Sequence, residues 1–393
     1  MSDPEILGAP PTPLEGQLYV TQYSGEYIDN NDLSKILNFL RHDGSYQGPV
    51  HHAHGRNVTI PLERPVSRLF DSVQVSGGAF IPMGINGNAD LPHSVALVDP
   101  STLKDIQPPA QGNTQFTHTY KIVEGDALVE RADKSPMGSY SQKVADRKLA
   151  MTLRALQIDS SILKAPHVIG KYEFFTLDDG QGGHPTALLF AVPMKGERTD
   201  SNIVSPLASI SAQKPELFLK ALDDFMPHLA STLFMIGNVA ADIHDAGMVH
   251  NQLTLGNVLA MENSDQQRSI YVADWETADE IKAGQEDFSK IFDLAIAFRS
   301  FTGMIDHFSA SSHLDSIQSN GILVEGFISL MSGYARLPVQ ATAIFAEINF
   351  DFCGEALSAI RKAGSNATDY EPLMELIQEL QKYRQTLVDN QSL

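Results

Sequence analysis

The most informative segment of the sequence is A-D-I-H-D-A-G-M-V-H-N-Q-L-T-L-G-N-V-L-A at residues 241–260, which S-I-Y-V-A-D-W-E-T-A follows at residues 269–278. Glycine commonly ends helices, so a long helix is predicted to end near Gly247 and to lead into a loop. Two short apolar runs flank the polar turn 262–268 and predict a hairpin. The stretch therefore predicts a helix, a loop and a two-stranded hairpin in that order.

Two oxygen-bearing side chains lie at the open end of this hairpin. Asn257 begins the first strand, and Asp274 directly follows the second strand. They are therefore expected at neighbouring ends of paired strands. A carboxamide and a carboxylate placed in this way can share a hard cation such as Mg²⁺.

The layout resembles the protein-kinase-like superfamily, whose catalytic loop H-R-D-x-x-x-x-N is followed by D-F-G. His250 matches the motif histidine, Asn257 the metal-binding asparagine, and Asp274 in D-W-E the metal-binding aspartate. The strings I-H-D-A-G-M-V-H and D-W-E-T-A look closer to small-molecule and lipopolysaccharide kinases than to eukaryotic protein kinases. The resemblance covers roughly residues 116–301. It implies a bilobal α+β fold that binds ATP and Mg²⁺ in a cleft between the lobes.

The chain departs from the template where the catalytic aspartate is expected. Gln252 stands there, five residues before Asn257 as in the template. An amide does not act as a general base, although it can orient a hydroxyl or a water molecule. No clear G-x-G-x-x-G loop is present either. Metal binding is therefore predicted to be retained and base catalysis to be lost.

The first half of the chain offers further candidates for nucleotide binding. Val192 and Met194 lie where the resemblance implies a hinge whose backbone holds the adenine. Asp146 lies on a predicted helix over residues 140–156, on one face with apolar neighbours, and a carboxylate there needs a partner. Arg131 is the first candidate for that partner and for the N-lobe cation, and Lys121 is the second.

The chain is predicted to consist of three parts: an N-terminal tail and extension over residues 1–57, a β-rich N-lobe over 58–193, and a helical C-lobe over 194–393 that carries the hairpin region 249–276. A weak helical pattern covers residues 18–40, and Asp287, Lys290 and Asp293 open the helix that follows D-W-E. Strands are predicted at 58–62, 70–75, 80–83, 95–98, 116–123, 127–132, 172–176, 187–192, 257–261 and 270–273, and helices at 140–156, 216–246, 288–301, 322–334, 341–360 and 371–388.

Composition and charge exclude several function classes. The 393 residues carry 28 Lys and Arg against 48 Asp and Glu, a net charge of −20, which disfavours nucleic acid and anionic lipid as partners. The single cysteine, Cys353, excludes an intramolecular disulfide and is expected in a helix core. No segment resembles a membrane span or a secretory signal, so a cytoplasmic protein is expected.

Three hypotheses remain open. The first is a divergent phosphotransferase that acts on a small molecule, a lipid-linked sugar or a protein. The second is a pseudokinase that binds nucleotide and acts through a partner. The third is a kinase-fold adenylyltransferase, which resembles selenoprotein-O-type enzymes that also lack the usual base. Gln252 favours the second and third, whereas Asn257 and Asp274 favour the first and third.

Overall fold

A computed structural model gives the structure of this chain, and internal contacts divide it into two units. Unit 1 comprises Met1–Leu156 and Pro166–Lys195, and unit 2 comprises Gln157–Ala165 and Gly196–Leu393. The residues that the structure describes are 16–20, 28–41, 51–52, 57–66, 70–76, 118–124, 127–133, 142–175, 184, 186–193, 197–198, 209–210, 215–262, 268–275, 277–281, 284, 286–311, 316–349, 354–356, 358–359 and 371–391. The predicted strands 80–83 and 95–98, together with Met194 and Cys353, lie outside these residues.

Unit 1 is built on a six-stranded antiparallel sheet with the order β1-β8-β9-β4-β3-β2. β9 is internal to the sheet and all seven of its residues are buried, as its continuous apolar sequence T-A-L-L-F-A-V predicts. The strands are β1 (Gly16–Val20), β2 (His51–His52), β3 (Asn57–Pro61), β4 (Ser72–Ser76), β8 (His167–Phe174) and β9 (Thr186–Val192).

Two helices and a separate hairpin complete the described part of unit 1. α2 (Gln142–Ala155) contacts β8 and β9, while β5 (His118–Glu124) pairs with β6 (Ala127–Asp133) in a two-stranded sheet. The helix predicted from residue 18 is wrong at its start. Residues 16–20 form β1 on the edge of the sheet, and α1 (Asn30–Arg41) begins just after Asp29, whose carboxylate accepts the Asn31 N–H at 2.8 Å.

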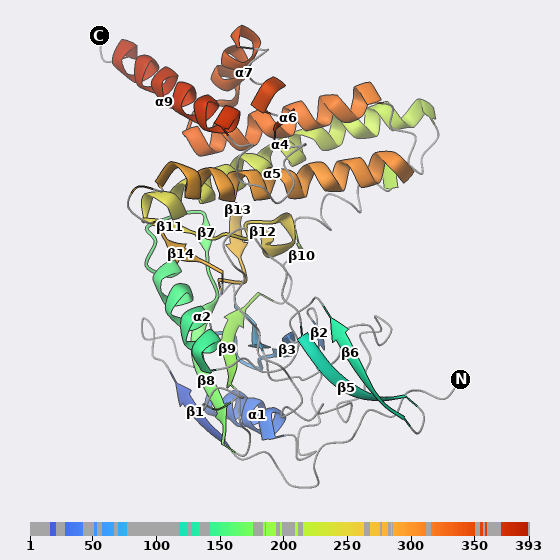
Figure 1. Cartoon of the computed structure of the whole chain (residues 1–393), viewed down its shortest axis with the longest axis vertical. Helices are drawn as coiled ribbons and strands as arrows, with labels where there is room; N and C mark the ends of the chain where they lie inside the picture. The colour runs from blue at the N-terminus through green and yellow to red at the C-terminus, as the bar shows by residue number, and fades with distance from the viewer. Residues whose placement is uncertain are drawn as a thin grey trace. The chain divides into compact units, whose positions relative to one another are not determined.

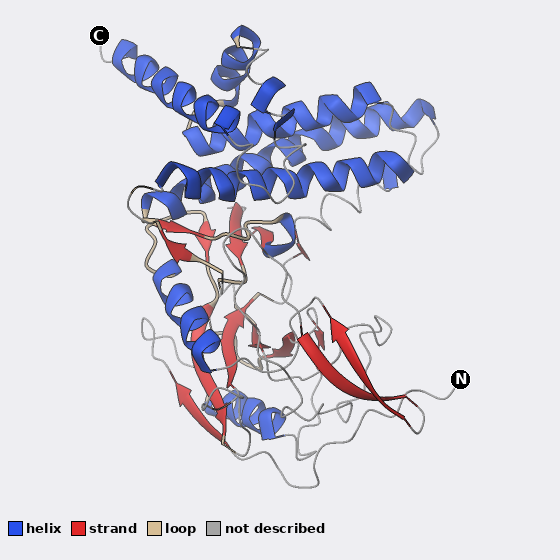
Figure 2. Cartoon of the chain, in the orientation of Figure 1, coloured by secondary structure: helices blue, strands red, loops and turns tan. Residues whose placement is uncertain are grey.

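Unit 2 is dominated by helices that run alongside one another (Figures 1 and 2). α4 and α6 approach so closely that a Cβ added to Gly333 would lie 1.9 Å from the Phe234 carbonyl oxygen. A Cβ on Gly237 would lie 2.1 Å from the Leu330 carbonyl oxygen. The helices of this unit include α4 (Pro215–Asp245), α5 (Glu286–Ser311), α6 (Ser316–Ala335), α7 (Val339–Ile348) and α9 (Glu371–Gln391).

Two small sheets of unit 2 contain the strands of segment 241–278. β12 (Val258–Glu262) and β13 (Arg268–Val272) form the predicted hairpin, with β10 (Glu197–Arg198) and β7 (Leu163–Lys164) on its two sides. β11 (Met248–Val249) pairs with β14 (Asp279–Glu280). Strand pairing therefore holds the hairpin on both of its edges, and the β11–β14 pairing holds the start of the loop that precedes it.

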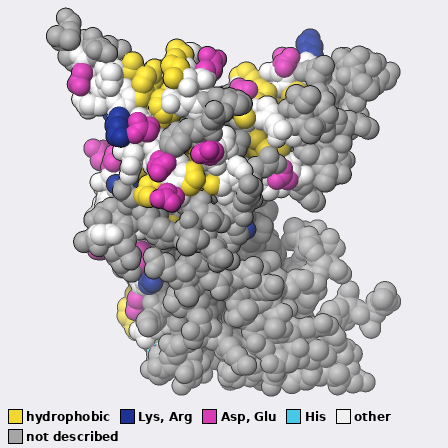
Figure 3. Space-filling model, turned by 45° about the horizontal axis from the view of Figure 1, so that its top comes forward, with side chains coloured by type: hydrophobic (Ala, Val, Ile, Leu, Met, Phe, Trp, Pro, Cys, Tyr) yellow, Lys and Arg dark blue, Asp and Glu magenta, His cyan; other side chains and the backbone are white. Residues whose placement is uncertain are grey.

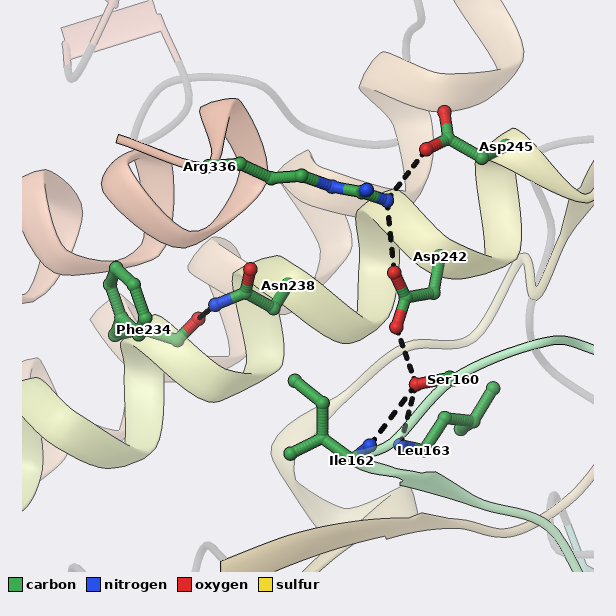
Figure 4. Close-up of polar contacts among 8 residues, drawn as sticks. All are labelled: Ser160, Ile162, Leu163, Phe234, Asn238, Asp242, Asp245 and Arg336. Carbon is green, nitrogen blue, oxygen red and sulfur yellow. Dashed lines mark hydrogen bonds and ion pairs between the residues drawn. The ribbon is translucent and has the colours of Figure 1, made fainter. Parts of the chain in front are cut away.

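The segment 157–165 is attached to α4 by a polar network (Figure 4). The Ser160 hydroxyl donates to Asp242 on α4 and accepts the Leu163 N–H at 2.9 Å. The other carboxylate oxygen of Asp242 binds the Arg336 guanidinium at 2.9 Å, and Arg336 also pairs with Asp245 at 2.6 Å. This network fixes β7 beside β13, so the chain between α2 and β8 contributes to unit 2.

The predicted mixed α+β content is confirmed. Among the described helices, no single one is long and apolar enough to cross a membrane, although Ser319–Ala335 and Val339–Ile348 together meet that length and composition test with a 116° bend between them. Hydrophobic and acidic side chains share the visible face of the helical unit (Figure 3). The large hydrophobic side chains that unit 2 exposes, within the described residues, are Val324, Val339, Ile344, Ile348 and Val388.

Candidate functional site

The loop between β11 and β12 is anchored by a buried aspartate on α5. Asp293 is 0% exposed, and its two carboxylate oxygens accept the backbone N–H groups of His250 and Asn251, each at 2.6 Å. His244 Nε2 lies 3.3 Å from the same carboxylate. Hydrogen bonds to a charged group are among the stronger ones in proteins, so Asp293 fixes the start of the loop.

His244 connects this anchor to α6. Its Nδ1 lies 3.0 Å from the Tyr334 hydroxyl, and the ring is buried. A carboxylate only accepts hydrogen bonds, so Nε2 is the donor to Asp293 and Nδ1 faces the hydroxyl. Helices α4, α5 and α6 therefore all contribute to holding the loop.

His250, the predicted motif histidine, is buried inside the loop. Its Nε2 lies 2.8 Å from the Ala273 carbonyl oxygen and must carry the proton, because a carbonyl only accepts. Its ring packs edge-on against Trp275 with 4.8 Å between ring centres. Nδ1 is buried without a hydrogen-bond partner among the described residues. This geometry makes His250 a link between the loop and the end of β13.

The hairpin brings Asn257 and Asp274 to neighbouring positions. The Asn257 carbonyl accepts the Ala273 N–H at 2.8 Å, so Asp274 is the residue that follows this pairing. The Asn257 side-chain amide donates to the Gln252 carbonyl at 3.0 Å. That hydrogen bond orients the side chain, and no described residue donates to its Oδ1. The oxygen is left as an acceptor at the same end of the hairpin as Asp274.

The backbone at the site adopts uncommon conformations. Asp274 has a φ of 56° and Asn251 a φ of 62°, both in the left-handed region, where Asn and Asp are the least penalised residues after Gly. Trp275, which follows Asp274, is 0% exposed and its indole N–H donates to the Val272 carbonyl at 2.9 Å. The buried Trp275 side chain and its hydrogen bond to Val272 thus maintain the turn that Asp274 makes.

Gln252 is half-buried in the loop, where the template carries its aspartate. Its backbone carbonyl accepts the Thr254 N–H at 2.7 Å as well as the Asn257 amide. A single carbonyl therefore receives two donors and stabilises the turn toward Asn257. In the described residues, no group of three or more His, Cys, Asp and Glu side chains is arranged to hold a metal ion.

The prediction that Asp146 in unit 1 lies on a buried apolar face of α2 is wrong, and its pairing with Arg131 stays a prediction. Asp146 is half-exposed and pairs with Lys171 on β8 at 2.8 Å, and Lys171 also pairs with Glu173 at 2.9 Å. Partial burial lowers the pKa of Lys171, but hydrogen bonds to Asp146 and Glu173 outweigh it and raise the pKa above 10.5. Arg131 lies on β6 and Lys121 on β5, but their side chains are outside the described ones.

The face of α2 that is buried carries a lysine that sequence reasoning missed. Ala145, Lys148, Thr152 and Ala155 are buried at helical spacing, and Lys148 is only 3% exposed. Its ammonium nitrogen lies 5.8 Å from the centre of the Phe190 ring on β9. Small residues on this face give no strong apolar signal, so periodicity alone favours the opposite face, which carries Asp146. Val192, the predicted hinge residue, is buried at the end of β9.

Asp293 and His244 are the other residues that sequence reasoning missed as site-forming. The sequence placed Asp293 on the helix after D-W-E without a role. A signal was present, because Asp293 is the sole charged residue in the apolar run F-D-L-A-I-A-F at 292–298. A lone acid on a buried helix face needs donors, and the loop backbone provides them.

Comparisons with known proteins give little beyond these observations. No family model matches the chain, and no curated protein matches it by sequence. A solved structure described as "WaaP in complex with acyl carrier protein" matches with a TM-score of 0.35 and 10% sequence identity, over 66% of this chain and 89% of that one. This structural similarity is weak, and the kinase-like bilobal arrangement stays a prediction.

Proposed function

We propose that the loop and hairpin of unit 2 bind a magnesium-bound nucleoside triphosphate, as part of a kinase-like protein. The observation that carries the proposal is the placement of Asn257 and Asp274 at one end of the β12–β13 hairpin. The Asn257 amide nitrogen is bound to the Gln252 carbonyl, so its oxygen remains available to a cation. Mg²⁺ prefers oxygen ligands and usually takes one or two from the protein, with phosphate and water supplying the rest. Two protein oxygens therefore suit this ion.

The proposed chemistry is phosphoryl transfer with a weakened proton-accepting group. Mg²⁺ would neutralise charge on the phosphates, and Asn257 and Asp274 would hold it. Gln252 would orient the acceptor hydroxyl without removing its proton. Phosphoryl transfer depends mainly on positioning and charge neutralisation, so slow turnover is compatible with an amide at this position.

Thermal-shift titration tests nucleotide binding directly. Wild-type protein is titrated with ATP, ADP and a non-hydrolysable ATP analogue, each with Mg²⁺ and with EDTA. At a ligand concentration 100-fold above Kd, we expect about 2.7 kcal/mol of stabilisation that requires Mg²⁺. Asn257→Ala and Asp274→Ala should remove the Mg²⁺-dependent part.

Asn238→Ala is the matched control for these variants. Asn238 also donates a side-chain amide hydrogen bond to a carbonyl, that of Phe234 at 3.2 Å, but it lies within α4, where its backbone approaches Gly333 of α6. It should retain the wild-type response to Mg²⁺ and nucleotide. A response that is equal in wild type, Asn257→Ala and Asp274→Ala would remove the basis of the proposal.

An amide at position 252 is also compatible with two other functions. The protein would then be a pseudokinase that binds nucleotide without turnover, or an adenylyltransferase. Separate incubations with ATP labelled at the α- or the γ-phosphate distinguish them. Transfer of γ-label alone indicates phosphoryl transfer, transfer of α-label indicates adenylyl transfer, and binding without transfer indicates a pseudokinase. Gln252→Asp should raise phosphoryl transfer roughly 100-fold or more, since general base catalysis commonly contributes that much. A fall in turnover would show that the amide has its own role.

A further inference from the structure

Two side-chain hydrogen bonds join the start of the loop to the segment after Asp274. The Asn251 side-chain amide donates to the Thr277 carbonyl at 2.8 Å, and the Thr277 hydroxyl donates to the His250 carbonyl at 2.9 Å. Thr277 is 6% exposed, so water does not readily replace these bonds. We refer to these two hydrogen bonds, which join residues 250 and 251 to Thr277, as the clamp.

The clamp extends a contact that the backbone makes further along. Val249 pairs with Asp279 in the β11–β14 sheet, and the Ile281 N–H donates to the Gly247 carbonyl at 2.9 Å. That backbone pairing begins five residues after Asp274, whereas the clamp acts three residues after it. The clamp therefore lies between the regular sheet and Asp274.

Asp274 needs such support because its backbone is in a costly conformation. A non-glycine residue at φ 56° is disfavoured by about 1–2 kcal/mol, and the surrounding structure must maintain it. Trp275, the residue after Asp274, is held in place by burial of its side chain. The clamp holds the backbone at Thr277. Asn251 is itself suited to its role, since asparagine tolerates the left-handed backbone that it adopts at φ 62°.

The identity of residue 251 bears on regulation. The template H-R-D has arginine at this position, whereas this chain has Asn251. In kinases the segment after the metal-binding aspartate is often ordered by phosphorylation, through an arginine that pairs with the added phosphate. Here a neutral amide binds the backbone of that segment directly. The contact requires no added phosphate.

We infer that Asn251 and Thr277 are positioning residues that hold Asp274 ready to bind Mg²⁺, independently of phosphorylation of the chain. The inference rests on the proposed function, because it assigns a consequence to metal binding at Asp274. Neither residue needs to touch the nucleotide. Their effect is expected in the Mg²⁺-dependent part of nucleotide affinity and not in the metal-free part.

The test measures nucleotide affinity by calorimetry with Mg²⁺ and with EDTA. Asn251→Gly removes the amide while allowing the left-handed backbone, and Thr277→Val removes the hydroxyl while keeping the side-chain shape. Each should weaken Mg²⁺-nucleotide binding about fivefold, the value of one neutral hydrogen bond, and leave binding in EDTA unchanged. The double variant should lose less than the product of the two effects, because both bonds support one contact.

Three further arms make the result specific. Thr277→Ser keeps the hydroxyl and should keep wild-type affinity. Thr302→Val is the matched control, because Thr302 on α5 is also buried and donates its hydroxyl to a carbonyl, that of Arg299 at 3.0 Å within its own helix. Protein treated with phosphatase and shown to be phosphate-free by mass spectrometry should bind Mg²⁺-nucleotide as tightly as untreated protein.

Each outcome supports or overturns the inference. Wild-type protein that shows no Mg²⁺-dependent binding overturns the proposed function and the inference together. Wild-type binding that Asn251→Gly and Thr277→Val leave unchanged overturns the inference alone. So does binding that disappears on phosphatase treatment. If both variants unfold, Thr277→Ala decides, because it also removes the hydroxyl: weaker Mg²⁺-dependent binding with unchanged binding in EDTA supports the inference, and wild-type affinity overturns it.

Discussion

Two helix-borne aspartates, one in each unit, show how differently the same side chain can act. Asp146 on α2 has a half-exposed carboxylate that pairs with Lys171, itself already paired with Glu173. Asp293 on α5 is completely buried and accepts two backbone N–H groups at 2.6 Å as well as a histidine. The sequence directed attention to Asp146, whereas Asp293 holds the loop. The number of buried donors that a carboxylate satisfies decides its structural importance, and sequence spacing does not reveal that number.

The largest expected effect in this comparison is the replacement of Asp293 by asparagine. The amide can accept at one oxygen, but its NH₂ group would face a backbone N–H and leave a buried donor unsatisfied. Hydrogen bonds to charged groups contribute about 1.5–3 kcal/mol each, so we expect a loss of about 3 kcal/mol or more in the free energy of unfolding. Urea unfolding followed by circular dichroism measures this loss.

Asp306→Asn is the control on the same helix, because Asp306 is exposed. Its free energy of unfolding should stay within about 0.5 kcal/mol of wild type, as is usual for surface substitutions. If Asp293→Asn also stayed within that range, the anchor would contribute little and the contrast with Asp146 would disappear.

A second prediction concerns α4 and α6, the helices that carry His244 and Tyr334 and so support Asp293. Gly333 on α6 precedes Tyr334, whose hydroxyl faces His244, and it lies against the backbone of α4. Gly333→Ala should destabilise the protein by about 1–3 kcal/mol, because the added methyl group would overlap the Phe234 carbonyl and push the helices apart. Urea unfolding measures the loss, and a weaker Mg²⁺-dependent nucleotide response would show that the loop depends on this packing.

Gly321→Ala provides the matched control on the same helix. A Cβ at Gly321 meets nothing within 4 Å, so the substitution changes helix propensity alone. We expect stabilisation by up to about 1 kcal/mol, the difference between alanine and glycine in a helix interior. Opposite signs at the two glycines would attribute the Gly333 effect to helix contact, and equal signs would refute that explanation.

Much of the fold follows from local patterns, because burial on one face leaves a periodic record in the sequence. The continuous run T-A-L-L-F-A-V gave β9, and the turn between two short apolar runs gave the β12–β13 hairpin. The placement of Asn257 beside Asp274 follows from strand pairing alone. The early strand β1 is not predicted because it lies on a sheet edge, where the sequence G-Q-L-Y-V shows no clear alternation of polar and apolar residues.

The parts of the candidate site that escaped prediction depend on contacts between residues distant in sequence. Asp293 meets the loop 42 and 43 residues before it, and Asp146 meets Lys171 25 residues after it. No local pattern records such pairings. Lys148 escaped for a different reason, since a lysine on a buried face contradicts the usual preference of charged residues for solvent. The resemblance to kinases located the loop and did not supply its supports.

The smallest expected effect belongs to Asp146, and it completes the comparison. Asp146→Asn should lower the free energy of unfolding by only about 0.5 kcal/mol, because exposed ion pairs contribute little and Lys171 keeps its contact with Glu173. The pKa of Lys171 is raised above its ordinary value of 10.5 in the folded protein, so the stabilisation is fully present below that pH and is lost as the pH rises through the raised value. Urea unfolding at neutral pH and at several pH values above 10.5 should therefore show the difference in free energy of unfolding between wild type and Asp146→Asn shrinking to zero.

Glu379→Gln, which removes a contact with Lys382 on the exposed face of α9, serves as the control for an ordinary surface pair. A loss at Asp146 as large as that at Asp293 would mean that α2 carries a site-forming carboxylate after all, as the sequence had predicted.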